Sequence, residues 1–157
     1  MSADALRLGA SISIRPAETR DVDAVTAIER ESFTLPWSKR SFVDLVRSHE
    51  GIFLVATYPN GAVVGYAVLL VAGDESELTN IAVAASARGQ GVGKLLLDAI
   101  VLRAQQRRAS RVFLEVRESN MTAQALYAAK GFQSVARRRR YYSQPVEDAL
   151  VLRLDLS

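Results

Sequence analysis

One short segment constrains the possible folds of this chain more than any other. The apolar strand pattern of residues 80–83 leads, through a short connection, into Arg88-Gly89-Gln90-Gly91-Val92-Gly93-Lys94, at the start of an amphipathic helix pattern. A helix N-terminus carries unpaired backbone N–H groups and about half a positive charge, so glycines there let a phosphate approach the main chain. Arg88 and Lys94 add two cations. The segment is typical of a pyrophosphate-binding loop, although the glycines could instead serve only to turn the chain from strand to helix.

Length and composition favour one globular domain. The chain has 157 residues, of which 49% are hydrophobic and 24% are charged, enough to bury a core of its own. We divide it into a short N-terminal extension, residues 1–10, and a single domain, residues 11–157. Lys and Arg number 20 against 17 Asp and Glu, and the resulting net charge of +3 is too small to indicate nucleic-acid binding.

The absence of cysteine excludes several classes of site. Without Cys the chain can carry no disulfide framework, thiol nucleophile or cysteine-based metal site. His49 is the single histidine and lacks partner ligands, so we expect no metal. Residues 1–11 lack the basic start and apolar stretch of a signal peptide, and no apolar run approaches the ~20 residues of a membrane span. We therefore expect a soluble, cytoplasmic protein with no membrane partner.

Hydrophobic periodicity predicts an α/β domain with a mixed sheet. Helices are predicted after the caps Thr19 and Ser38, over 91–107, and over 120–130, where Gly131 ends the last one. In the third helix Leu95 is among the residues predicted to face the core. Strands are predicted over residues 11–15, 52–58, 63–71, 77–83, 111–116, 133–142 and 150–156. Both faces of the strand at 111–116 are apolar, which indicates helices on both sides of the sheet.

Three residues in the second half of the chain are candidates for chemistry. Glu115 lies in a strand, on the face opposite Leu114, where a carboxylate beside apolar neighbours could remove a proton from an amine. From spacing alone, an ion pair with Arg117 on the same face is favoured. Tyr127 follows Asn120 by nearly two helical turns, so the two side chains project from about the same face and could converge on one ligand. The alternatives are a core aromatic for Tyr127 and a simple helix cap for Asn120.

Aromatic residues at two other places are candidates for substrate contacts. Trp37, the single tryptophan, either plugs the space between the first two helices or forms a wall of an acceptor site. Tyr141 and Tyr142 follow the four arginines of residues 137–140. Such a run is usually a solvated strand, but arginine and tyrosine are also suited to gripping a peptide.

The order of these motifs resembles the GNAT superfamily of N-acetyltransferases and, within it, the RimI branch of ribosomal-protein N-terminal alanine acetyltransferases. The resemblance covers most of the last two thirds of the chain. The motifs that carry it are Phe33-x-x-Pro36-Trp37-Ser38, Asn80-Ile81-Ala82-Val83, Arg88-x-x-Gly91-x-Gly93, Leu114-Glu115-Val116-Arg117-x-Ser119-Asn120, Ala125-Leu126-Tyr127, Gly131-Phe132 and Arg140-Tyr141-Tyr142.

This resemblance implies a GNAT fold, with a mostly antiparallel mixed sheet flanked by helices on both faces, and acetyl-coenzyme A as co-substrate. Glu115 would be the general base and Tyr127 the acid that protonates the departing thiolate. Trp37, Tyr141 and Tyr142 would bind the acceptor substrate. The residues that would bind the cofactor are Ile81, Ala82, Val83, Arg88, Gly89, Gln90, Gly91, Val92, Gly93, Lys94 and Asn120.

The implied acceptor is the N-terminal alanine of a protein, a small-subunit ribosomal protein. Proton affinity favours an α-amine, with a pKa of about 7.7–8.0, over lysine at about 10.4, because a single glutamate base suits the more weakly basic group. Acetylation of lysine or of a small-molecule amine stays open. A non-catalytic acyl-coenzyme A-binding module is disfavoured by the presence of both Glu115 and Tyr127. A nucleic-acid partner for the arginine run is weaker still, because aromatic residues occur only at its end.

Overall fold

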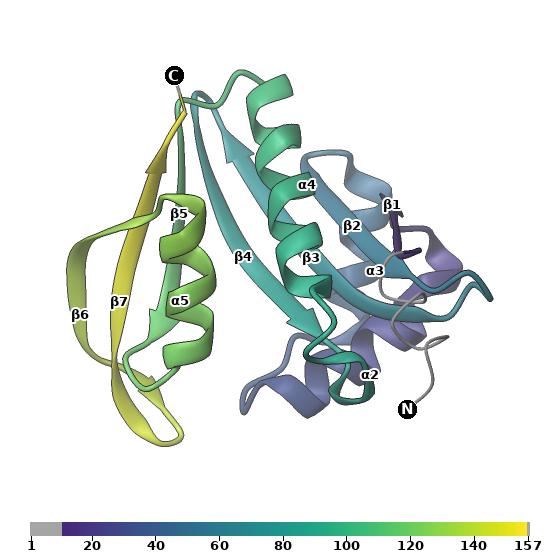
Figure 1. Cartoon of the computed structure of the whole chain (residues 1–157), viewed down its shortest axis with the longest axis horizontal. Coiled ribbons are helices and arrows are strands. Elements are labelled where there is room, and N and C mark those ends of the chain that lie inside the picture. The colour runs from purple at the N-terminus through teal and green to yellow at the C-terminus, as the bar shows by residue number, and fades with distance from the viewer. Residues whose placement is uncertain (1–10, 157) are drawn as a thin grey trace.

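The computed structural model describes residues 11–156, and seven strands in this part of the chain form one sheet in the order β1-β2-β3-β4-β5-β7-β6 (Figure 1). All neighbouring strands are antiparallel except β4 and β5, which are parallel, so the sheet is mixed and mostly antiparallel as expected. The strands are β1 (Ser13–Pro16), β2 (Gly51–Thr57), β3 (Val63–Ala72), β4 (Glu75–Val83), β5 (Arg111–Arg117), β6 (Gln133–Ser143) and β7 (Val146–Asp155).

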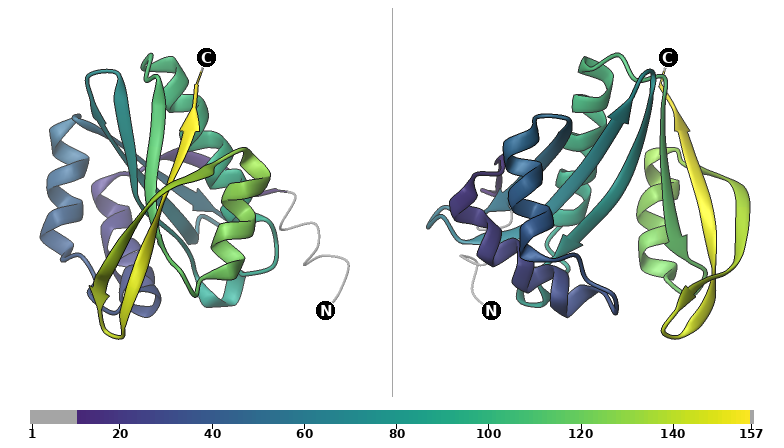
Figure 2. Two further views of the ribbon diagram at one scale, coloured as in Figure 1. Left: turned by 90° about the vertical axis from the view of Figure 1, so that its left-hand side faces the viewer. Right: turned by 180° about the vertical axis from the view of Figure 1, so that it is seen from behind.

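Two helices cover each face of the sheet (Figure 2). Helices α2 (Val22–Ser32) and α3 (Lys39–Ser48) pack on one face, and α4 (Val92–Gln106) and α5 (Met121–Lys130) pack on the other. Each face has its own buried apolar cluster. The prediction of helices on both sides is therefore confirmed. None of the described helices is long and apolar enough to cross a membrane.

The predicted helix ends are correct where the signal is local. Ser38 accepts a hydrogen bond from the backbone N–H of Ser41, Asn120 accepts one from Ala123, and Gly131 ends α5 in the left-handed conformation. These residue types favour those positions because they satisfy or relieve the unpaired groups at helix ends.

The prediction that Thr19 caps the first helix is wrong. Residues Thr19–Asp21 form a 3₁₀ turn, η1, and α2 begins only at Val22. The Asp21 carboxylate accepts a hydrogen bond from the Glu18 N–H at 2.8 Å and is also held by Arg15. This tertiary ion pair sets the start of the helix in place of a threonine cap.

The buried face of α4 and the start of β7 also differ from expectation. Leu95 is 39% exposed, whereas Leu97 and Val101 are buried, so the face of α4 that meets the sheet is rotated from the predicted stripe. Strand β7 begins at Val146 and not at 150. Its first residues pair with β6 across an irregular register between Arg138 and Tyr142, which breaks the alternation that a strand prediction needs.

The parallel pair β4 and β5 is joined over only a short length. Glu75–Glu77 pair with Arg111–Phe113, and beyond this the two strands separate (Figure 1). Strand β4 stays paired with β3 but contains one extra residue, Thr79, between the pairs formed by Leu78 and Asn80. The opening between β4 and β5 positions the candidate site.

The ion pair at the start of α2 is expected to stabilise the fold in a pH-dependent way. Arg15 bonds both carboxylate oxygens of Asp21, at 2.7 and 2.8 Å, and this bonding holds the pKa of Asp21 below its usual value. The stabilisation is full above the unfolded-state pKa of about 3.9 and is lost as the pH falls through the lower folded-state value. Asp21→Asn should therefore lower the free energy of unfolding by about 2 kcal/mol at neutral pH.

Thermal unfolding at pH 7 and at pH 3 checks this, because the difference between wild type and Asp21→Asn should shrink at the lower pH. Asp23→Asn is the matched control, since its ion pair with Lys39 is exposed and such pairs contribute little. An Asp21→Asn effect of equal size at both pH values would contradict the assignment to the ionised pair.

Candidate active site

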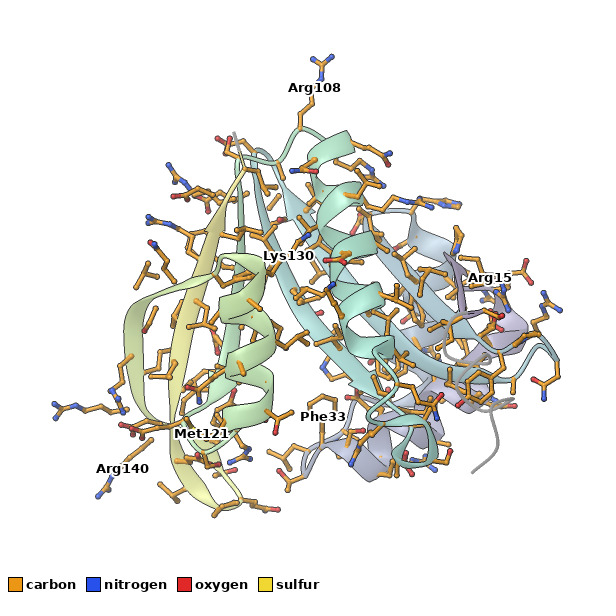
Figure 3. The ribbon with its side chains drawn as sticks, viewed as in Figure 1. Arg15, Phe33, Arg108, Met121, Lys130 and Arg140 are labelled. Carbon is orange, nitrogen blue, oxygen red and sulfur yellow. The ribbon has the colours of Figure 1, made fainter. Side chains whose placement is uncertain are left out.

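A pocket of about 530 Å³ lies where β4 and β5 separate. Its walls come from the end of α2 and the following loop, from the separated parts of β4 and β5, from the first two turns of α5 and from the end of β6. Phe33, at the edge of the pocket near α2, is labelled in Figure 3. The pocket therefore collects segments that are far apart in the sequence.

The pocket is reached by side chains from both faces of the sheet. Leu114 and Val116 of β5 belong to the buried cluster under α4 and α5, so Glu115 and Arg117 project from the opposite face. Arg117 confirms this direction, because it donates to the Thr34 hydroxyl in the loop after α2 at 3.2 Å. Tyr127 reaches the same pocket from α5, on the other face.

Glu115 is half-buried and does not form the ion pair with Arg117 that its position allowed. Its Oε1 lies 3.4 Å from Nε of Arg138, and its side chain is 17% exposed. Arg138 in turn lies over the Tyr141 ring, 5.4 Å from its centroid. Hydrogen bonding to Glu115 raises the pKa of the Tyr141 phenol, with burial adding to the shift. Glu115 thus sits in a polar cluster contributed largely by β6.

Arg117 instead ties together three of the pocket's walls. It pairs with Glu147 at 3.3 Å and donates to the backbone oxygens of Gln144 and Pro145, both at 3.2 Å. Its guanidinium lies 4.2 Å from the centroid of the Tyr142 ring. Burial, followed by the charge of Glu115, raises the pKa of the Tyr142 phenol to about 12.

Tyr127 and Asn120 converge on the pocket, as their spacing suggested. Tyr127 is 6% exposed and packs edge-on against Phe132, with ring centroids 5.8 Å apart. Burial raises the pKa of its phenol, with a smaller contribution from Tyr142, so the hydroxyl stays protonated near neutral pH. Asn120 caps α5 with Oδ1 and also lines the pocket. Tyr127 therefore packs in the core and Asn120 caps α5, and both residues also line the pocket.

The glycine loop lies outside the pocket wall but has the geometry of an open cradle. Gly89 and Gly91 have φ values of 80° and 81°, and a Cβ built on either would meet nothing within 4 Å. The first hydrogen bond of α4 runs from the Leu95 N–H to the Gly91 oxygen at 3.1 Å. The N–H groups that come before Leu95 in the first helical turn therefore have no acceptor within the helix.

The remaining loop residues have more varied surroundings. Gln90 accepts a hydrogen bond from the Tyr58 hydroxyl at 3.0 Å, and Nε of Arg88 lies 3.3 Å from the Val83 oxygen. Lys94 is exposed. Val92 is buried in the core, so only its main chain could reach a ligand. A Cβ on Gly93 would make ordinary contacts with Leu126 and Val83.

Of the three β4 residues predicted to bind cofactor, only Ile81 lines the pocket. Ala82 is packed in the cluster under α2 and α3, and Val83 packs against the cluster under α4. Trp37 has both of the positions considered for it from the sequence. It packs on Phe42, with ring centroids 5.6 Å apart, and it also lines the pocket. Tyr141 and Tyr142 also line the pocket.

The arginine run is exposed, with specific ion pairs at its start. Arg137 pairs with Glu118 at 2.8 Å and with Asp148 at 3.0 Å. The regular alternation expected of a strand fails further on, where Arg140 adopts a positive φ of 51° and its N–H bonds to Asp148. This irregular segment precedes the two tyrosines of the pocket.

Sequence reasoning missed Glu29, a buried acidic residue in the pocket wall. Its carboxylate accepts hydrogen bonds from the Trp37 N–H, the Tyr66 hydroxyl and the Asn80 amide. A signal was available: Glu29 follows Val22 by seven residues, two helical turns, and so lies on the apolar face of α2.

Within residues 11–156, no group of three or more His, Asp and Glu side chains could hold a metal ion.

Comparison with known proteins places the chain in a family. Residues 22–132 match the model of the acetyltransferase (GNAT) family, and the chain belongs to that family. It is 34% identical over 147 residues to the ribosomal protein bS18-alanine N-acetyltransferase of Escherichia coli (strain K12), covering 92% of this chain and 98% of that protein.

Solved structures agree with this assignment. The crystal structure of the ribosomal-protein-S18-alanine N-acetyltransferase from Escherichia coli superposes with a TM-score of 0.84 at 34% identity, covering 93% of this chain and 94% of that one. A GNAT superfamily phosphinothricin acetyltransferase from Sinorhizobium meliloti, in complex with acetyl-coenzyme A, shares the fold, with a TM-score of 0.82 at 22% identity over 94% of this chain and 89% of that one.

Proposed function

We propose that this protein transfers the acetyl group of acetyl-coenzyme A to the α-amine of an N-terminal alanine, and that the acceptor is ribosomal protein bS18. The observation that carries the proposal is the pocket between β4 and β5, where Glu115 and Tyr127 approach one cavity from opposite faces of the sheet. The 34% identity to a bS18-alanine N-acetyltransferase over nearly the whole chain supports the acceptor. A ribosomal acceptor implies a cytoplasmic location.

The proposed cofactor site begins at the glycine loop. Open space around Gly89 and Gly91, together with the N–H groups at the start of α4, suits a pyrophosphate, and Arg88 and Lys94 supply positive charge. From there the pantetheine arm would run toward the pocket along the separated part of β4. The main chain of Ile81–Val83 and the side chain of Asn120 would hold it.

The proposed chemistry is direct attack in a ternary complex, to which acetyl-coenzyme A brings the thioester. Glu115 takes a proton from the acceptor amine as the new N–C bond forms, directly or through water. Backbone groups of β4 stabilise the negative charge that develops on the carbonyl oxygen. Tyr127 gives a proton to the sulfur as the C–S bond breaks, so the amine loses one proton and the thiolate gains one. The phenol of Tyr127 is protonated near neutral pH and so carries the proton that is transferred.

The acceptor would enter from the face of Glu115. Trp37, Tyr141 and Tyr142 line the pocket and offer aromatic surfaces to a peptide. Arg117 supports this side by linking β5, the turn before β7 and the loop after α2.

A peptide panel tests the proposed acceptor. We expect a peptide with a free N-terminal alanine to be acetylated on its α-amine, and the same peptide with a blocked N-terminus and free lysines to remain unmodified. Near neutral pH the lysine amine is harder to deprotonate by over two pKa units, or about 3 kcal/mol. Mass spectrometry of the products locates the acetyl group. Equal or faster acetylation of the blocked peptide would move this protein to the lysine-modifying enzymes.

A further inference from the structure

The loop between α2 and α3 forms one wall of the pocket. We call its residues 33–37 the acceptor loop; Phe33, at its start, is labelled in Figure 3. Arg117 projects from the same face of β5 as Glu115 and donates to this loop, so the loop lies on the face of Glu115. The residues of the loop that line the pocket are Phe33, Thr34, Leu35 and Trp37. An acceptor bound beside Glu115 would therefore meet this loop.

Beyond its first residue, the acceptor loop is held by two hydrogen bonds within residues 11–156. The Trp37 N–H donates to Oε2 of Glu29 at 2.8 Å, and Arg117 donates to the Thr34 hydroxyl at 3.2 Å. The bond to Thr34 is exposed to solvent, whereas Glu29 is 1% exposed. The Trp37 ring also packs on α3. The position of the loop depends on these few contacts, because its main chain belongs to no helix or strand.

The location of Glu29 is costly for the fold. The residue lies in the last turn of α2, where the helix dipole disfavours a negative charge. It is buried, and the ion pairs found within residues 11–156 do not include it. Burial of a charge without an opposite charge destabilises a protein unless hydrogen-bond donors compensate. Neither helix electrostatics nor core packing favours a glutamate here, so the explanation lies in the groups that its carboxylate holds.

The carboxylate of Glu29 holds two strands and the acceptor loop. Its Oε1 accepts from the Tyr66 hydroxyl, and Nδ2 of Asn80 lies 3.1 and 3.3 Å from its two oxygens. Tyr66 lies in β3 and Asn80 in β4, and the ladder between these strands holds both without Glu29. Trp37 has no such ladder. Of the three donors, only the one in the loop depends on Glu29 for its position.

We propose that Glu29 is a positioning residue for acceptor binding. By holding the Trp37 N–H, it fixes the acceptor loop against β3 and β4 and so sets the shape of the acceptor side of the pocket. It takes part in no proton transfer and acts through the loop. A loop that is already in place need not be ordered when the peptide binds, which favours affinity. The inference rests on the proposed function, because that function assigns this side of the pocket to the acceptor.

The test compares Glu29→Leu with wild type, using a peptide with a free N-terminal alanine as acceptor. We expect KM for the peptide to rise about 10-fold, through loss of one hydrogen bond to a charged group, and kcat to change less than threefold. The dissociation constant of acetyl-coenzyme A should change less than twofold. A folded Glu29→Leu protein with the wild-type KM, or one whose cofactor affinity falls as much as KM rises, would overturn the proposal.

Glu29→Gln is the conservative variant that should preserve the loop. Its side-chain oxygen can accept from the Trp37 N–H, and its NH₂ group can donate to the Tyr66 hydroxyl or to an Asn80 amide turned by half a rotation. KM for the peptide should stay within about threefold of wild type. An equal rise of KM in Glu29→Gln and Glu29→Leu would assign the effect to the lost charge and contradict the positioning role.

Tyr66→Phe is the matched control for loss of stability. It removes a donor to Oε1 of Glu29 and leaves the bond from Trp37 to Oε2 in place. The thermal stability should fall, because the buried carboxylate loses a hydrogen bond, but KM for the peptide should change less than twofold. If Tyr66→Phe raises KM as much as Glu29→Leu does, general destabilisation explains the effect and the positioning role is wrong.

Amide hydrogen exchange of the wild-type protein decides the matter if Glu29→Leu does not fold. The Trp37 N–H should exchange much more slowly than the Leu35 N–H, which has no acceptor within residues 11–156. NMR spectroscopy resolves the two amides. Exchange of both at the same rate would show that Glu29 does not hold the loop and would overturn the proposal.

These outcomes separate the two proposals. If the wild-type protein acetylates no peptide with a free N-terminal alanine, the proposed function fails and the role of Glu29 in acceptor binding fails with it. If wild type acetylates the peptide and Glu29→Leu does so with the same KM, only the role of Glu29 fails.

Discussion

Replacing Glu115 by Gln is expected to lower kcat by about 10²- to 10⁴-fold, and Tyr127→Phe should do the same, because each change removes a proposed proton-transfer group. Acetyl-coenzyme A affinity should stay near that of wild type, since neither change alters the glycine loop. The acidic limb of the pH–rate profile should flatten in Glu115→Gln. Steady-state kinetics across a pH series, with cofactor affinity measured by calorimetry, checks these expectations.

Glu118→Gln is the matched control for the change at Glu115. Glu118 is exposed at the end of β5 and its carboxylate pairs with Arg137, outside the pocket. Its replacement should leave kcat unchanged. Near wild-type turnover in both Glu115→Gln and Tyr127→Phe would show that these residues support packing and the cluster around Arg138, and not the chemistry.

Gly91→Val is expected to weaken acetyl-coenzyme A binding by about 100-fold or more. The residue has a φ of 81° and open space where its Cβ would lie, so a branched side chain would occupy the proposed pyrophosphate position and disturb the N–H groups at the start of α4. Loss of two hydrogen bonds to a charged group accounts for a change of this size. Isothermal titration calorimetry measures it directly.

The strain of placing valine at a positive φ must be separated from the loss of the binding site. Gly61, in the turn between β2 and β3, has a φ of 90° and equally open surroundings, so Gly61→Val carries similar strain away from the loop. It should leave cofactor affinity intact. Wild-type affinity in a folded Gly91→Val protein would remove the loop from the cofactor site.

Much of the fold could be predicted because its signals are local. Helix caps such as Ser38 and Asn120, and the left-handed stop at Gly131, act within one turn of the chain. The strands were recognisable from their apolar runs and the helices from their spacing. Predictions failed at Thr19, where an ion pair from β1 sets the helix start, and at β7, where an irregular register with β6 replaces regular alternation.

The candidate site was predictable in part. Glu115, Tyr127 and Asn120 belong to motifs with a recognisable order, and they do line one pocket. The partners of these residues were not predictable. Glu115 pairs with Arg138 of β6, across the intervening strand β7, and Arg117 pairs with Glu147 of the neighbouring β7, so both pairs depend on the strand order of the folded sheet. Sequence spacing favoured a pair between Glu115 and Arg117, because it carries no information on which strands lie side by side.

The amino-acid sequence alone was enough for the class of fold, the helix ends that are capped locally and the glycine loop, because each depends on residues within a few positions of one another. The tertiary structure decided the separation of β4 and β5 and the burial of Glu29 against Asn80, residues 51 positions apart. Hydrogen bonds between distant segments form only once the sheet order and register are set. The shape and polarity of the pocket therefore depend on the packed molecule.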